Sequence, residues 1–146
     1  MQQIRNTDKL TRAMKTLEDA ISYARTANFQ ESDNSFKDIL HAAVVQNFHL
    51  ALNVCQKMLK YQLLQNSGES NNYQIGESDE SLIIAAAKEN LITNPQNWLE
   101  YLNSHYLTNS TPSAVRTYEK ATNFLTDAKE LLITCSKRKY NERRAA

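Results

Sequence analysis

The residues best suited to chemistry lie in one polar segment in the second half of the chain. Residues 103–111 are rich in side-chain donors and acceptors, and they include His105, Tyr106, Asn109 and Ser110. A histidine beside amide and hydroxyl groups can act as an acid, a base or a ligand donor near neutral pH. The alternative is a surface histidine in a loop that only turns the chain. These four residues are the candidate ligand-binding site.

Familiar catalytic and cofactor motifs are missing from the sequence. It contains no P-loop, no dinucleotide-type glycine pattern, no paired cysteines and no zinc motif of histidine and glutamate. No serine fits a strand-to-helix nucleophile elbow. His41 and His49 lie more than two turns apart on one expected helix, too far along it to share an ion. We therefore expect no cofactor and no metal, and we assign no catalytic residue.

Length and composition favour one helical domain. A chain of 146 residues can bury roughly 68–70% of its unfolded surface without a disulfide or a metal. Only two glycines and two prolines occur, and sheets and barrels need more turns that contain glycine. The formal net charge of +1 makes no general case for nucleic-acid binding.

The cysteines and the hydropathy of the sequence predict the cellular compartment of the protein. Cys55 and Cys135 are far apart and lack metal-type spacing, so we interpret both as buried thiols of a reducing compartment. No apolar run approaches the roughly 20 residues of a membrane span, and the polar start of the chain is no signal peptide. We predict a soluble, cytoplasmic protein with no membrane contact.

Apolar residues at helical spacing predict five helices. The ranges are 8–27, 35–65, a short helix from about 82, another from Pro95, and a last helix after Thr111 and Pro112. Ser78 and Asn94 are the expected N-caps of the two short helices. The predicted fold is an all-α, antiparallel up-and-down bundle of four main helices plus a short helix. Residues 1–136 would form the bundle domain and residues 137–146 a basic C-terminal tail.

Several apolar residues could belong to the core or to an interface. The long helix over 35–65 is apolar around much of its circumference, so it must be central or lie at a subunit contact. Phe48, Leu52 and the face formed by Trp98 and Tyr101 fit either environment. The basic tail is either a solvated helix end or a small patch that faces an anion or RNA.

Two segments resemble the nucleotidyltransferase substrate-binding proteins, a branch of the HEPN helical-bundle superfamily. Residues 46–61 occupy the place of that family's long central helix. Residues 86–92, Trp98–Leu102 and Leu107–Thr108 are similar to its "glycine-leucine-isoleucine, tryptophan-leucine, leucine-threonine" region. The similarity runs from about Leu10 to Leu132.

The resemblance implies a homodimer whose partner is a small nucleotidyltransferase of the minimal type. Many such pairs are toxin–antitoxin modules. In the ribonuclease members, an arginine followed a few residues later by a histidine forms the active site across the dimer. His105 takes the arginine's place in this chain, Tyr106 that of the polar residue after it, and Ser110 that of the histidine. His49 and Asn53 stand at two acidic positions of the long helix, and Gln56 stands at an aromatic one.

These replacements predict loss of the ribonuclease chemistry. Metal-independent RNA cleavage needs an acid or base near the 2′-hydroxyl and a cation for the developing phosphate charge. Ser110 cannot exchange a proton near neutral pH, and His105 cannot fill both roles. The favoured function is a non-catalytic binding subunit that accepts a nucleotide, RNA or partner residues in a dimer groove. The alternatives are a ribonuclease with a diverged active site and a diverged protein-interaction module.

Overall fold

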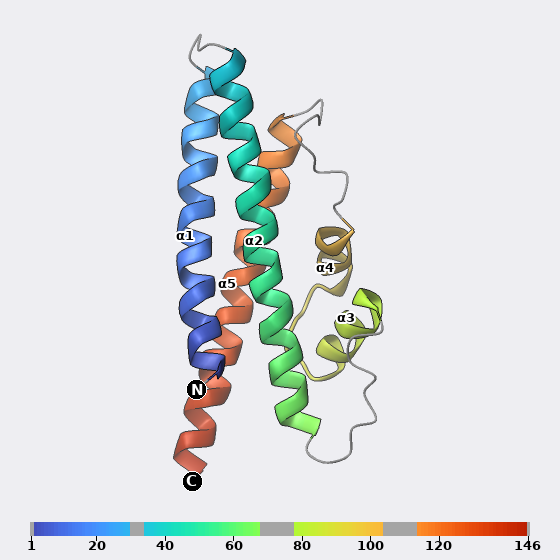
Figure 1. Ribbon diagram of the computed structural model, residues 1–146. Helices are drawn as coiled ribbons and strands as arrows, with labels where there is room; N and C mark the ends of the chain where they lie inside the picture. Colours follow the sequence, from blue (N-terminus) through green and yellow to red (C-terminus); the bar gives the residue numbers. More distant parts are fainter. Residues whose placement is uncertain (1, 30–33, 68–77, 104–113, 146) are drawn as a thin grey trace.

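The computed structural model describes residues 2–29, 34–67, 78–103 and 114–145 (Figure 1). They form five helices, namely α1 (Gln2–Phe29), α2 (Asn34–Ser67), α3 (Asp79–Lys88), α4 (Pro95–Leu102) and α5 (Ala114–Ala145). No strand occurs within these ranges. The all-α helical bundle expected from the sequence is therefore confirmed.

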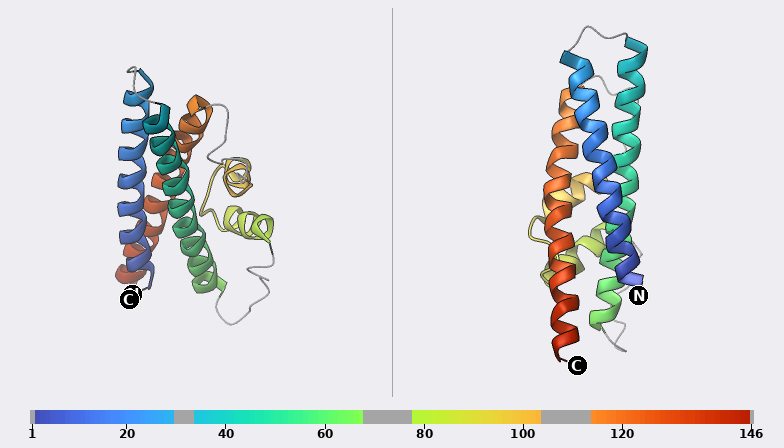
Figure 2. Two further views of the ribbon diagram at one scale, coloured as in Figure 1. Left: turned by 45° about the horizontal axis from the view of Figure 1, so that its top comes forward. Right: turned by 90° about the vertical axis from the view of Figure 1, so that its left-hand side faces the viewer.

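The chain crosses the length of the bundle four times, in alternating directions. Figure 1 shows α1 rising, α2 descending beside it and α5 descending behind α2, so α2 and α5 run parallel. The two short helices, α3 below and α4 above, lead the chain back up from the end of α2 to the start of α5. They lie on the side of α2 away from α1 (Figures 1 and 2). Three of these crossings are the long helices α1, α2 and α5, and the crossing before α5 is divided between the short helices α3 and α4.

The predicted apolar stripes form one core. The apolar residues that repeat at helical spacing on α1 and α5 are buried, namely Leu10, Met14, Leu17, Ile21 and Ala24 on α1 and Tyr118, Ala121, Leu125, Ala128 and Cys135 on α5. Phe48, Leu52, Trp98 and Tyr101 all belong to this core, which decides between the two environments left open by the sequence. α1 begins at Gln2, earlier than expected, and the buried Asn6 lies in its added turns.

The start and the end of α3 follow from specific residues. The Ser81 backbone N–H donates to the Ser78 hydroxyl at 3.1 Å, so the predicted N-cap is confirmed. At the other end Asn90 adopts a positive φ of 58°, a conformation that asparagine tolerates well. The N–H groups of Asn90 and Leu91 donate to the carbonyls of Ala87 and Ala86. These two bonds are a Schellman motif, and they end the helix.

The two cysteines are free, buried thiols. Burial raises the pKa of the Cys55 thiol, and the nearby Cys135 raises it further. The expectation of buried thiols is confirmed. Separately, none of the helices described here is long and apolar enough to cross a membrane.

Candidate functional site

The four candidate residues, His105, Tyr106, Asn109 and Ser110, lie outside the described residues. The described chain stops at Asn103, just after α4, and resumes at Ala114, the first residue of α5. What the structure describes is therefore the framework that carries both ends of the candidate segment.

An aromatic cluster attaches α4 to the two parallel helices. The Phe124 ring of α5 lies at the centre, with its centroid 5.0 Å from Phe48 of α2, 5.4 Å from Tyr101 and 6.0 Å from Trp98. All three contacts are edge-to-face, the arrangement that aromatic quadrupoles favour. The cluster fixes the helix that leads into the candidate segment.

A buried carboxylate reinforces this attachment. Asp127 of α5 is 6% exposed and accepts three side-chain hydrogen bonds from residues at or near α4. The donors are the Tyr101 hydroxyl at 2.6 Å, the Asn94 amide at 3.3 Å and the Asn97 amide at 3.4 Å. Several donors compensate the desolvation of a buried charge, which is otherwise costly.

This arrangement revises the expected role of Asn94. Asn94 occupies the N-cap position of α4 with Pro95 after it, as predicted, but its side chain makes no capping hydrogen bond. The amide donates to Asp127 instead. Asp127 was not among the candidates predicted from the sequence, although its position three residues after Phe124 on the apolar side of α5 is a signal that could have identified it.

The Tyr101 hydroxyl is held in its protonated form. Burial raises the pKa of Tyr101 well above its usual range, and the hydrogen bond to the Asp127 carboxylate and that negative charge raise it further. The folded protein therefore keeps this proton at a pH where the unfolded chain, with a tyrosine pKa of about 10, releases it.

This shift predicts a loss of stability in alkali. The contribution of the Tyr101 hydroxyl to the free energy of unfolding is complete below about pH 10. It decreases as the pH rises above that value, by up to about 1.4 kcal/mol per pH unit. Thermal or urea unfolding between about pH 9 and 11 should show a shallower decline for Tyr101→Phe than for the wild type. Parallel stability curves for the two proteins would contradict this assignment, because the contribution of Cys55 is common to both.

A small cavity of about 210 Å³ adjoins the buried carboxylate. The turn between α3 and α4, Trp98 and one side of α5 line it, with Asp127 and Glu130 as its acidic residues. The Thr93 hydroxyl donates to the Glu130 carboxylate at 3.3 Å across its rim. Two carboxylates disfavour a phosphate here, so a bound group would be neutral or cationic.

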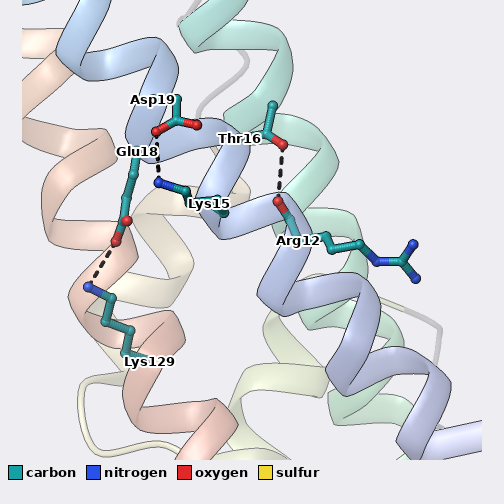
Figure 3. A network of polar contacts seen from close by, with 6 residues as sticks. All are labelled: Arg12, Lys15, Thr16, Glu18, Asp19 and Lys129. Atoms are coloured by element: carbon teal, nitrogen blue, oxygen red, sulfur yellow. Dashed lines mark hydrogen bonds and ion pairs between the residues drawn. The ribbon is translucent and has the colours of Figure 1, made fainter.

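A second, more open groove of about 470 Å³ lies between α1 and α5. Lys129 of α5 forms an ion pair of 2.9 Å with Glu18 of α1, and the Arg25 guanidinium donates to the Thr122 hydroxyl at 3.2 Å. Figure 3 shows the first of these pairs beside the Lys15–Asp19 pair on α1. Such exposed pairs contribute about 0–1 kcal/mol each, so they position the groove's walls only weakly.

His41 is a further candidate residue that was not predicted from the sequence. It is buried in α2, and neither ring nitrogen has a hydrogen-bond partner among the residues that the structure describes. Its ring centroid lies 5.9 Å from that of Tyr118, within the first two turns of α5. An unsatisfied buried polar group costs about 1–3 kcal/mol and calls for an explanation. The place of His41 beside the start of α5 makes it a candidate for contact with a ligand.

The structure also describes the three residues of α2 that differ from the acidic and aromatic residues expected from the resemblance, namely His49, Asn53 and Gln56. Gln56 donates to the Asp79 carboxylate at 3.2 Å and so joins α2 to the first turn of α3. His49 is half-buried with its ring 5.4 Å from that of Phe48, and Asn53 is exposed. Across the described ranges, no three histidine, cysteine, aspartate or glutamate residues are grouped so as to hold a metal ion.

The fold and this framework define an all-α helical bundle protein. The chain belongs to the family described as nucleotidyltransferase substrate binding protein like, whose model matches residues 5–137. The resemblance inferred from the sequence is thereby confirmed.

A solved structure shares the fold. It is HI0074 from Haemophilus influenzae, described as revealing the fold of a substrate binding domain of a nucleotidyltransferase. The TM-score is 0.74 at 24% identity, over 89% of this chain and 98% of that one. At this identity the likeness concerns the fold alone. A search of curated proteins found no match.

Proposed function

We propose that this protein is the non-catalytic, homodimeric binding subunit of a small nucleotidyltransferase. The observation that carries the proposal is the family match over residues 5–137, which extends from α1 into α5 and so includes all five helices. The partner supplies the transfer chemistry, and this chain supplies a surface for the nucleotide or for the molecule to be modified. The free, buried thiols support the expected cytoplasmic location.

The chemistry of the described residues supports a binding role. Asp127 and the Tyr101 hydroxyl are committed to each other in the core, and the pKa of Cys55 is raised by burial. None of these groups is presented to a substrate as a reactive acid, base or nucleophile.

Within the proposed function, His105, Tyr106, Asn109 and Ser110 bind the ligand in the dimer groove. The aromatic cluster and the Asp127 network support this by holding α4 and α5, the helices on either side of the segment. His41, near the start of α5, would add one further ring nitrogen to that site.

Co-purification tests the partner. The chain should form a stable complex with a small nucleotidyltransferase of the minimal type when the two are expressed together, and an enzyme encoded beside its own gene is the first to test. Titration of a nucleotide panel should then give micromolar binding, weakened about tenfold or more by His105→Ala. Asn123→Ala, at an exposed position of α5, is the matched control and should leave the affinity unchanged.

Two results would refute the proposal. The first is failure of the chain to associate with that enzyme under any nucleotide condition. The second is cleavage of RNA by the purified chain that disappears in His105→Ala, because that result would identify a ribonuclease.

A further inference from the structure

The cavity beside Asp127 has no part in the proposed function. Its volume is about 210 Å³. A protein cavity of about 150 Å³ holds benzene, so this one can hold a group of roughly six to ten non-hydrogen atoms. Residues 90–93 form one wall, and the right-hand view of Figure 2 shows this turn beside α5. Asp127, Glu130 and Thr134 follow the helical repeat along the α5 wall.

Asp127 is a buried carboxylate that no cation of the described residues neutralises. Its three hydrogen bonds come from the uncharged Tyr101 hydroxyl and from two asparagine amides. The ion pairs between described residues involve other carboxylates, so neither Asp127 nor Glu130 has a cationic partner within those ranges. Aspartate is almost never fully buried unless it is paired. The cavity is a side from which a cation can approach this carboxylate.

Glu130 adds a second negative charge to the same wall of the cavity. It lies one turn after Asp127 and is exposed, and it accepts the hydrogen bond from the Thr93 hydroxyl at 3.3 Å. A carboxylate has about four acceptor positions, so Glu130 can accept a further donor. Two carboxylates on one face of α5 create a negative potential that attracts an ammonium or guanidinium group.

The other lining residues suit the carbon part of an organic cation. Leu91, Ile92 and Leu131 are buried and apolar. Trp98 also lines the cavity, and indole attracts cations more strongly than the other aromatic side chains do. A metal ion fits less well, because no three metal-ligating side chains are grouped within the described ranges.

We propose that this cavity binds a small organic cation. Its ammonium or guanidinium group lies beside Asp127 and Glu130, and its carbon skeleton packs against Trp98. The inference goes beyond the proposed function and does not rest on it, because the site uses the α3–α4 turn, Trp98 and α5, and not residues 105–110.

A matched series of fragments tests the charge of the ligand. Benzylammonium, benzyl alcohol and benzoate each have about eight or nine non-hydrogen atoms and so suit the cavity volume, but they differ in charge. Trp98 is the single tryptophan of the chain, so its fluorescence and its indole N–H resonance report on this site. At neutral pH, benzylammonium should change both signals with a dissociation constant of about 1 mM or lower. Benzyl alcohol should bind at least about tenfold more weakly, and benzoate should not bind.

Two results of this series would overturn the inference. The first is an equal affinity for benzylammonium and benzyl alcohol, because the cavity would then select only an apolar group. The second is no response of Trp98 to benzylammonium at a concentration about twentyfold above the expected dissociation constant.

Glu130→Gln tests the acidic wall. The substitution keeps the shape of an exposed side chain and removes its charge, so it should weaken benzylammonium binding about three- to fivefold and leave benzyl alcohol unaffected. Glu119→Gln makes the same change at an exposed position of α5 outside the cavity lining, and it should bind as the wild type does. An unchanged affinity of Glu130→Gln for benzylammonium would contradict the role of this carboxylate.

Thr134→Phe tests the location. Thr134 is half-buried and lines the cavity, so a phenylalanine there should fill the space and abolish the response of Trp98 to benzylammonium. Ser136→Phe, at an exposed position of α5 outside the lining, is the control and should keep the wild-type affinity. Thermal unfolding checks that both variants are folded. Wild-type affinity in a folded Thr134→Phe would place the cation elsewhere and overturn the site.

The outcomes separate this inference from the proposed function. Charge-selective binding of benzylammonium by a chain that does not associate with a nucleotidyltransferase would support the cavity site and refute the proposed function. Association with the enzyme, combined with no response of Trp98 to benzylammonium, would overturn only the cavity site.

Discussion

Phe124→Ala is expected to lower the free energy of unfolding by about 3–5 kcal/mol. The Phe124 side chain is fully buried and contacts aromatic rings from both α2 and α4. Its removal eliminates apolar burial and three edge-to-face contacts, and it leaves a cavity between three helices that cannot all move inward together.

The loss should be largest at α4. Because α4 has only eight residues and depends on this cluster, its amides should exchange hydrogen faster in Phe124→Ala than those of α1. Urea unfolding combined with hydrogen exchange measures both effects. Ile133→Ala, a truncation at an exposed position of the same helix, is the control and should cost less than about 1 kcal/mol. Equal costs for the two variants would show that the cluster does not anchor the bundle.

Asp127→Ala is expected to lower the free energy of unfolding by about 2–4 kcal/mol. The substitution leaves the buried Tyr101 hydroxyl without the acceptor that lies 2.6 Å from it. The amides of Asn94 and Asn97 are on exposed residues and can turn to water, so most of the cost comes from Tyr101.

A double-mutant cycle can isolate that contact. Tyr101→Phe, Asp127→Ala and the double variant should give a coupling energy of at least about 1 kcal/mol, because the two groups share one buried hydrogen bond. Glu130→Ala, which removes an exposed carboxylate one turn away, should change stability by about 0.5 kcal/mol or less. Additive effects of the two single substitutions would contradict the described contact.

Much of the fold could be predicted from local sequence alone. Leu10, Met14 and Leu17 on α1 and Ala121, Leu125 and Ala128 on α5 have helical spacing, and all of them are buried. Ser78 caps α3 as expected because an N-cap needs only a side-chain oxygen next to the first turn. The family resemblance rested on the same short-range patterns, and the family match confirms it.

The partners of the polar residues could not be predicted in this way. Asn94 has the sequence context of an N-cap, yet its amide is used by a carboxylate on α5. His41 has the spacing of an apolar position, and only the packing around it reveals that its ring nitrogens have no partner within the described ranges. Ligand binding by His105, Tyr106, Asn109 and Ser110 remains a prediction.

Local patterns were enough to place the helices and the apolar face of each, because helix periodicity and capping depend on residues a few positions apart. Which apolar residues are enclosed and which stay exposed followed from the packing of the helices, as Phe48 and Leu50 show two residues apart on α2. The burial of Asp127 beside Tyr101 followed from the same packing. Burial and hydrogen-bond partners depend on how distant segments pack, and a helical repeat carries no information about which helix lies against which face.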